Sequence, residues 1–129
     1  MTASYLHRFV EEDFHYWTGR VGQWFDPTGP AGNHLLEGRD LQLTMMNGIY
    51  VGITVEGTAL YAGKVRRSDQ GASDRFRNHP QPIEEWSSVW LLPFVADCSD
   101  PLVRHYEAAL IRRHRPLWNC QHNRGRRRT

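Results

Sequence analysis

Apolar residues recur at three- and four-residue steps at the start of the chain, at Leu6, Val10, Phe14, Trp17, Val21 and Trp24. This is helical spacing, so the pattern predicts an N-terminal helix, although Gly19 and Gly22 weaken its second half. Glycine and proline are then concentrated in residues 26–32, which predicts a loop. Residues 35–46 fit neither the helical nor the strand period, and the pattern leaves their structure open.

The middle of the chain has the composition of a β-hairpin. Residues 49–55 and 59–65 are rich in β-branched and aromatic residues. The short connection between them contains Glu56 and Gly57, and a glycine-containing link between two such runs is typical of a hairpin.

Three elements are predicted after the hairpin. The first is a short helix over 72–79, and the second is a strand over 87–92 with an extension to 95. Ser99 followed by Asp100 and Pro101 predicts the start of a helix, because a capping side chain precedes a proline at the first helical position. We expect this helix to end near Arg115, before a proline.

This order of elements predicts an α+β fold, with a small three-stranded antiparallel sheet flanked by helices and a helical N-terminal extension. The expected division is an extension over 1–46 that serves DNA binding or dimerisation, a catalytic core over 47–120 and a basic tail over 121–129.

The composition is that of a soluble globular domain, with 40% hydrophobic and 23% charged residues. The longest apolar stretch is too short to cross a bilayer, so no membrane is expected as a partner. The N-terminal residues lack the layout of a signal peptide, and the two cysteines, Cys98 and Cys120, could pair only once. We therefore expect a cytoplasmic protein with reduced thiols.

Positive charge is concentrated in the second half of the chain. Residues 1–63 carry three arginines against seven acids, or −4, whereas residues 64–129 carry thirteen cations against seven acids, or +6. This asymmetry is typical of a polyanion-binding surface, although a solvated cationic tail would give the same count. The candidate nucleic-acid contacts are Arg66, Arg67, Arg77, Arg112, Arg113, Arg124, Arg126, Arg127 and Arg128.

Glu107 is the strongest single candidate for chemistry. It lies four residues after Val103 and three before Leu110, so it projects on or beside the apolar side of its helix. An acid in that position needs a partner, because burial of an unpaired carboxylate is costly. The partner is either an arginine or a metal ion, and one carboxylate with several waters suits Mg²⁺.

Tyr50, Tyr61 and Lys64 fall on the two strands of the predicted hairpin. Tyrosines in strands are commonly packing residues, but a phenolic oxygen can also position or deprotonate an attacking water. Lys64 is the only lysine of the chain, and its place near a phenol would favour the phenolate or bring an ammonium to a phosphate oxygen.

Three further polar residues are candidates. His79 lies four positions after Arg75, so the two share one face of the predicted helix. An arginine in this position can contact a phosphate through two N–H groups. Otherwise Arg75 is a surface residue and His79 interacts with the helix dipole. Asn119 follows Pro116, Leu117 and Trp118, and as a loop residue it would cap backbone groups and fix the end of the Glu107 helix.

Together these residues resemble the GIY-YIG nuclease superfamily over roughly residues 47–120. The likeness is carried in chain order by Gly48-Ile49-Tyr50, Tyr61-Ala62-Gly63-Lys64, Arg75, His79, Glu107 and Asn119. Ala62 stands where isoleucine or valine is usual. The four-residue spacing of Arg75 and His79 is similar to that of the restriction-endonuclease branch.

The resemblance implies hydrolysis of a phosphodiester bond with Mg²⁺ or Mn²⁺, leaving a 5′-phosphate and a 3′-hydroxyl. It implies that Glu107 binds the metal and that Tyr50 is the leading candidate for the general base. Tyr61 would position the nucleophile or the phosphate, and His79 would assist the tyrosine. Lys64 and Arg75 would stabilise the transition state, and Asn119 would support the site geometry.

The expected function is therefore a metal-dependent DNA endonuclease of restriction, defence or mobile-element type. DNA is the expected partner, and a homodimer is a possible assembly because a duplex cutter with one active site commonly needs two subunits. The alternatives are a nucleic-acid-binding module without activity, a nuclease toxin and a structure-specific repair nuclease.

Overall fold

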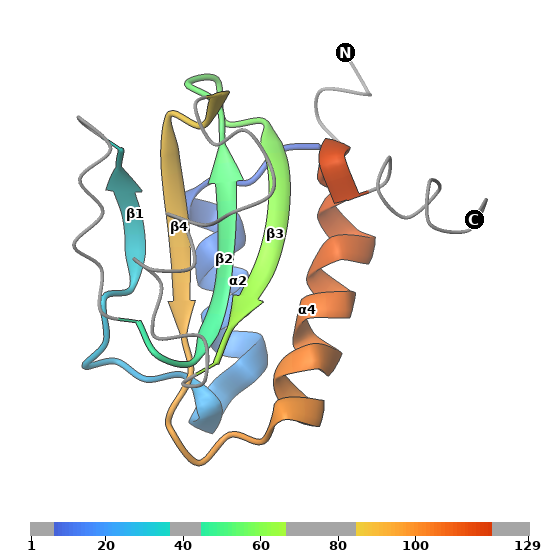
Figure 1. The fold of residues 1–129 in the computed structure, drawn as a ribbon. Helices are drawn as coiled ribbons and strands as arrows, with labels where there is room; N and C mark the ends of the chain where they lie inside the picture. Colours follow the sequence, from blue (N-terminus) through green and yellow to red (C-terminus); the bar gives the residue numbers. More distant parts are fainter. Residues whose placement is uncertain (1–6, 37–44, 67–84, 120–129) are drawn as a thin grey trace.

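A computed structural model describes residues 7–36, 45–66 and 85–119 of the chain. These residues form an α+β fold around one antiparallel sheet with the strand order β1-β4-β2-β3 (Figure 1). The elements are, in chain order, α2 (Glu11–Val21), the 3₁₀ helix η1 (Gly22–Trp24), β1 (Gly32–Leu35), β2 (Gly48–Ile53), β3 (Ala59–Val65), β4 (Ser88–Pro93) and α4 (Asp100–His114).

The predicted hairpin is confirmed as β2 and β3, which pair from Gly48 with Val65 to Ile53 with Ala59. The register shifts after Gly52, which creates an irregularity near the turn. The turn closes through backbone hydrogen bonds at 54–58, where Gly57 adopts a φ of 91° that favours glycine. The predicted short helix over 72–79 lies outside the described residues.

The sheet has four strands, and the prediction of three is wrong. The additional strand is β1, which pairs antiparallel with β4, from Gly32 with Leu91 to Leu35 with Ser88. It has only four residues, and its alternation of half-buried and exposed positions is too short to stand out in the sequence. Pairing with β4, rather than its own composition, defines this strand.

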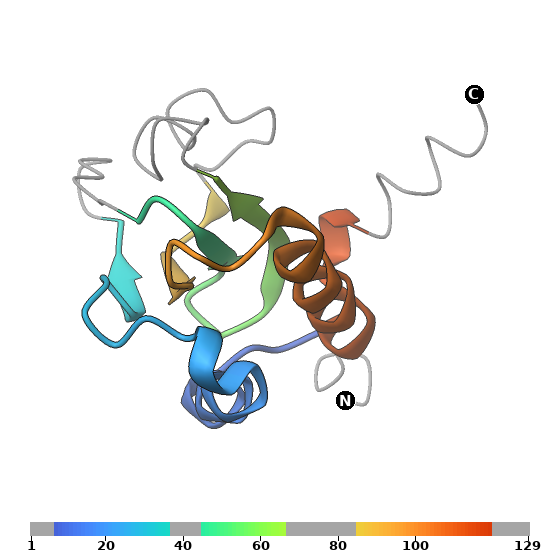
Figure 2. The same cartoon turned by 90° about the horizontal axis from the view of Figure 1, so that it is seen from below.

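The helices cover the sheet unequally (Figures 1 and 2). Helix α2 lies across one face, where its buried Phe14, Trp17 and Val21 join the larger of two apolar clusters. Helix α4 runs beside the edge strand β3 and contributes Val103 and Leu110 to the same cluster. The N-terminal region thus shares one core with the hairpin.

The second apolar cluster lies on the opposite face of the sheet. Because side chains alternate along a strand, Tyr50 of β2 and Leu91 of β4 point to this face, while Ile49 and Leu92 point to the α2 face. Trp86 and Met45 pack beside Tyr50 and Leu91 in this cluster. This is the face that carries the two tyrosines named above.

Helix α4 is bounded largely as the sequence predicts. Pro101 lies in its first turn, and the helix ends at His114. The C-cap residue, Arg115, has a left-handed φ of 48° and immediately precedes a proline. The Ser99 side chain makes no capping hydrogen bond, in contrast to its predicted role. Its backbone carbonyl instead accepts hydrogen bonds from Leu102 and Val103.

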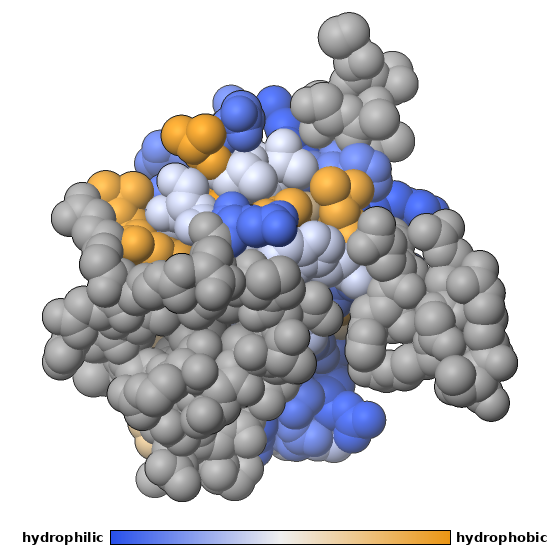
Figure 3. Space-filling view, turned by 45° about the horizontal axis from the view of Figure 1, so that its top comes forward, coloured by the Kyte–Doolittle hydropathy of each residue, from blue (hydrophilic) through white to orange (hydrophobic). Residues whose placement is uncertain are grey.

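The surface of the described residues carries few large apolar side chains. Tyr16, Leu35, Met46 and Val55 are exposed, and in the view of Figure 3 the visible hydrophobic areas are small and separated by polar residues. No helix among the described residues is long and apolar enough to span a membrane.

A buried histidine joins three segments of the fold. Nε2 of His114 accepts a hydrogen bond of 2.8 Å from the indole N–H of Trp17, so Nδ1 carries the proton and donates to the carbonyl of Arg8 at 3.1 Å. The neutral ring therefore satisfies both partners. Burial lowers the pKa of His114 below its ordinary value, while the nearby Asp13 carboxylate opposes this shift.

This arrangement predicts a pH-dependent stability. The unfolded chain binds a proton at His114 near pH 6.5, whereas the folded chain resists it. The stabilisation is therefore complete above about pH 6.5 and is lost as the pH falls toward the lower folded pKa, with a slope of at most about 1.4 kcal/mol per pH unit. Urea unfolding between pH 7.5 and 5 measures it.

The control for this experiment is His114→Gln, whose amide can accept and donate at the same two positions without titrating. We expect the slope below pH 6.5 to flatten in His114→Gln and to persist in His105→Gln, which changes an exposed histidine of the same helix. An equal slope in all three proteins would contradict the assignment.

Candidate active site

The structure brings Tyr50 and Tyr61 together on one face of the sheet. Their ring centroids are 6.3 Å apart, with the ring planes inclined by 40°. In the register of β2 and β3, Tyr50 is opposite Gly63 and Tyr61 is opposite Gly52, so the two tyrosines are diagonal neighbours. Tyr50 is fully buried and Tyr61 is half-buried.

Gly63 makes room for the Tyr50 ring. A Cβ atom at this position would lie 2.6 Å from the phenolic oxygen of Tyr50 and 2.8 Å from its Cζ. The ring of Tyr50 therefore crosses the backbone of β3 at the one residue without a side chain, and reaches toward Tyr61. The glycine that the sequence motif contains is needed for this close approach.

Trp86 is held by a similar arrangement and was not singled out from the sequence. Its indole ring occupies the space above Gly52, where a Cβ would overlap the ring atoms. Its centroid lies 6.1 Å from that of Tyr50, so both Tyr61 and Trp86 are aromatic neighbours of Tyr50. The available signal was Gly52 in the middle of a strand, since such a glycine often marks a close approach.

Asn119 is hydrogen-bonded to the backbone of the edge strand. Its Oδ1 accepts from the N–H of Ala62 at 2.8 Å, and its Nδ2 donates to the carbonyl of Ala62 at 3.0 Å. Asn119 is buried, and it satisfies both outward-facing backbone groups between Tyr61 and Gly63. The sequence predicted a capping role at the end of α4, whereas the partner in the structure is a strand 57 residues away.

Glu107 lies on the flank of α4 that faces away from α2. The guanidinium carbon of Arg113 lies 4.1 Å from the ring centroid of Tyr16 on α2. The flank of α4 that carries Arg113 is therefore the one that faces α2. With 100° per residue, Glu107 and Asp100 project from the other side of the buried line formed by Val103 and Leu110. The Glu107 side chain is half-buried, as the sequence predicted from its spacing.

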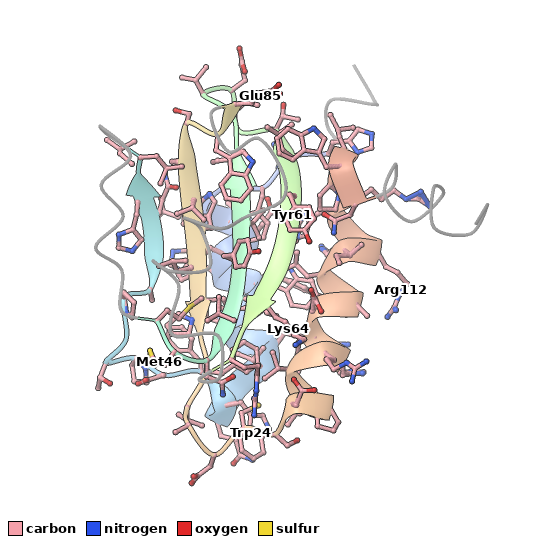
Figure 4. The ribbon with its side chains drawn as sticks, viewed as in Figure 1. Trp24, Met46, Tyr61, Lys64, Glu85 and Arg112 are labelled. Carbon is pink, nitrogen blue, oxygen red and sulfur yellow. The ribbon has the colours of Figure 1, made fainter. Side chains whose placement is uncertain are left out.

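Lys64 forms an ion pair with the first residue of α4. Its Nζ lies 3.4 Å from Oδ1 of Asp100, and its side chain is 29% exposed. It pairs with Ile49 across the hairpin, so strand alternation places its Cβ on the face opposite to the tyrosines. Figure 4 shows Tyr61 and Lys64 along the edge of β3 beside α4. The described partner of this ammonium is a carboxylate and not a phenol.

Arg66 was predicted to contact nucleic acid, and in the structure it makes internal contacts. Its Nη1 donates to Oδ1 of Asn47 at 2.9 Å and to the carbonyl of Cys98 at 3.0 Å, while Nε lies 3.6 Å from Asp100. These contacts connect the end of β3 to the loop before α4. Burial raises the pKa of the Cys98 thiol, an effect that Arg66 opposes.

The other predicted nucleic-acid contacts divide into two groups. Arg112 and Arg113 are exposed on α4, and Figure 4 shows Arg112 on the outer side of this helix. The remaining candidates lie outside the described residues; these are Arg67, Arg77, Arg124, Arg126, Arg127 and Arg128. Two of the predicted catalytic residues, Arg75 and His79, also lie outside them.

The described residues contain no group of three or more His, Cys, Asp or Glu side chains that could hold a metal ion. A half-buried glutamate beside an edge strand could bind Mg²⁺, which keeps several waters and needs only one or two carboxylates.

A cavity of about 600 Å³ lies apart from these residues. It is formed where the 26–30 loop meets the ends of β2 and β4, and its lining includes Asp26, Met45, Asn47 and Pro93. None of the predicted catalytic residues that the structure describes lines this cavity.

Comparison of the chain with protein-family models, with curated proteins and with solved structures gives no match in any of the three. The assignment of chemistry to this site therefore depends on its residues and geometry.

A methyl group at Gly63 tests the packing of Tyr50. We expect Gly63→Ala to reduce the free energy of unfolding by about 1–3 kcal/mol, since the new Cβ displaces the Tyr50 ring from a filled site. Gly19→Ala is the control, because a Cβ there meets nothing within 4 Å and alanine favours the helix. Urea unfolding measures both, and equal stability of the two variants would contradict this packing.

Asn119→Asp tests the contact between α4 and β3. The aspartate keeps an acceptor for the Ala62 N–H but leaves the Ala62 carbonyl without its donor. We expect a loss of about 1–3 kcal/mol in the free energy of unfolding. Asn33→Asp makes the same change at an exposed position of β1 and should have little effect. A thermal melt that is unchanged by Asn119→Asp would show that the contact is dispensable.

Proposed function

We propose that this protein is a metal-dependent endonuclease that hydrolyses phosphodiester bonds in DNA. The observation that carries the proposal is the adjacent pair of Tyr50 on β2 and Tyr61 on β3. Asn119, which follows the Glu107 helix, is hydrogen-bonded to β3 beside Tyr61. A phenol pair and a carboxylate, brought to one edge of the sheet, are the groups that activation of water beside a single metal ion requires.

The roles follow from position and chemistry. Tyr50, as the phenolate formed after loss of its own proton to solvent, would accept the proton of the attacking water. Tyr61, which is half-buried, would orient the water or the phosphate. Lys64 supplies positive charge at the edge strand β3. Arg75 and His79 lie outside the described residues, and their proposed roles rest on the sequence motif. Glu107 would hold Mg²⁺ or Mn²⁺, which when bound polarises a phosphate oxygen and stabilises the developing charge.

DNA is the proposed partner because exposed arginines accompany these groups. Arg104, Arg112 and Arg113 lie on α4 and are exposed. Contacts between such arginines and the phosphate backbone would release counterions from the DNA, which favours binding. We further propose a restriction, defence or mobile-element setting, with a homodimer as the form that cuts both strands and the cytoplasm as the location. The related roles of nuclease toxin and repair nuclease require the same site.

One observation favours a second function, which is DNA binding without cleavage. The Tyr50 side chain is 0% exposed, and a general base must meet the water that it deprotonates. A protein in which Tyr50 only packs against Tyr61 and Trp86 would bind DNA with a steep salt dependence and cleave nothing.

Plasmid cleavage in Mg²⁺ separates the two functions. We expect nicking or linearisation by the wild-type protein, abolished by EDTA, and a decrease of at least about 100-fold in Glu107→Gln. Tyr50→Phe keeps the ring and its packing but removes the proton acceptor, and should lower the rate by about 10²- to 10⁴-fold. The matched control is Glu56→Gln in the exposed hairpin turn, which should cleave at the wild-type rate.

The outcomes are distinct. Equal cleavage by wild-type protein and Glu107→Gln would remove Glu107 from the mechanism. Absence of cleavage by the wild-type protein in Mg²⁺ and in Mn²⁺, together with binding that weakens steeply with salt, would instead support the binding function.

A further inference from the structure

Asp100 lies among three cationic side chains. Its Oδ1 is 3.4 Å from Nζ of Lys64 and 3.6 Å from Nε of Arg66, and its Oδ2 is 3.6 Å from Nη1 of Arg104. One carboxylate is thus shared by three cations. Lys64 lies on β3, Arg66 directly follows this strand, and Arg104 lies on the next turn of α4. The Asp100 side chain is 38% exposed, so the cluster borders solvent.

The three cations differ in how firmly they are held. Arg66 is anchored by two hydrogen bonds from its Nη1, to Asn47 and to the Cys98 carbonyl. Asn47 is itself buried and donates to the carbonyl of Val95 at 2.9 Å. Arg104, in contrast, is 66% exposed and extends along the helix surface. Of the three cations, Arg66 therefore does most to hold the Asp100 carboxylate in place.

Lys64 is the flexible member that this arrangement would immobilise. A lysine side chain has four rotatable bonds and an ammonium that any nearby anion attracts. Its described contact is Asp100, which is connected through Arg66 and Asn47 to the backbone around β4. The position of the ammonium thus depends on a chain of contacts that begins in the buried part of the fold.

The location of the cluster relates it to the proposed active site. Helix α4 contacts β3 at Lys64 through Asp100 and again at Ala62 through Asn119, after the helix has ended. Glu107 lies between these two points in the sequence, on the same flank of α4 as Asp100. Asp100 therefore sets the position of Lys64 relative to the helix that carries the proposed metal ligand.

We propose that Asp100 is a positioning residue for Lys64, an inference that depends on the proposed nuclease function. The carboxylate holds the ammonium at the solvent-bordering edge of β3, and its own negative charge repels a phosphodiester backbone. Its removal should therefore have opposite effects on two quantities. Cleavage slows because the ammonium is no longer held, while DNA binding strengthens because one negative charge is lost from the site.

The test compares Asp100→Asn with Asp97→Asn, which removes the same charge from an exposed turn three residues earlier. We expect Asp100→Asn to lower the single-turnover cleavage rate by about 10- to 100-fold, while the Kd for the same duplex in EDTA decreases. Asp97→Asn should leave the cleavage rate unchanged. Asp100→Glu should recover part of the rate, whereas a loss of fold would lower rate and affinity together.

A second measurement does not need cleavage. Lys64 is the only lysine, so selective ¹⁵N labelling of lysine gives one side-chain Nζ signal. We expect this signal to shift in Asp100→Asn, to remain in place in Asp97→Asn and to respond to added duplex DNA in EDTA. A signal that is unaffected by Asp100→Asn would overturn the inference, as would a rate equal to or above that of the wild type.

The two proposals can fail separately. If the wild-type protein cleaves nothing, the nuclease function fails, and the Nζ signal and the Kd alone decide whether Asp100 positions Lys64. If the protein cleaves and Asp100→Asn cleaves equally well, the nuclease function stands and the positioning role is refuted.

Discussion

The structure depends on how the edge strand β3 is attached to the rest of the molecule. One side of β3 pairs with β2, and the backbone of Ala62 on the other side is satisfied by the amide of Asn119. Without that amide, the N–H and the carbonyl between Tyr61 and Gly63 would be buried without partners, at a cost of the order of 1–3 kcal/mol each. The amide thereby fixes the separation between the strand and α4.

The same strand explains why the tyrosine face is so closely packed. Two glycines on neighbouring strands, Gly52 and Gly63, are each covered by an aromatic ring from elsewhere. Tyr50 packs beside both Tyr61 and Trp86 as a consequence, with little freedom to change its rotamer. Preorganisation of this kind favours catalysis, but it also means that the local packing has to open before solvent reaches the Tyr50 oxygen.

Local patterns in the sequence were sufficient for the hairpin, for α4 and for the half-buried position of Glu107, because each is encoded within one continuous stretch of the chain. They were not sufficient for β1, whose four residues become a strand only by pairing with β4. The contacts of Asn119, Arg66 and Asp100 were also missed in detail. Each joins segments far apart in the chain, and no periodicity records such a pairing.

The hydrogen bonds of Asn119 have a consequence for the outer edge of the sheet. This residue comes after α4 and after a proline, in a short helical stretch at 117–119. Its amide nevertheless serves as the outer neighbour of β3 at Ala62, in the place that a fifth strand would otherwise take. Replacement of the Asn119 amide would therefore leave the pairing of β2 with β3 in place while exposing a sheet edge that could recruit another chain.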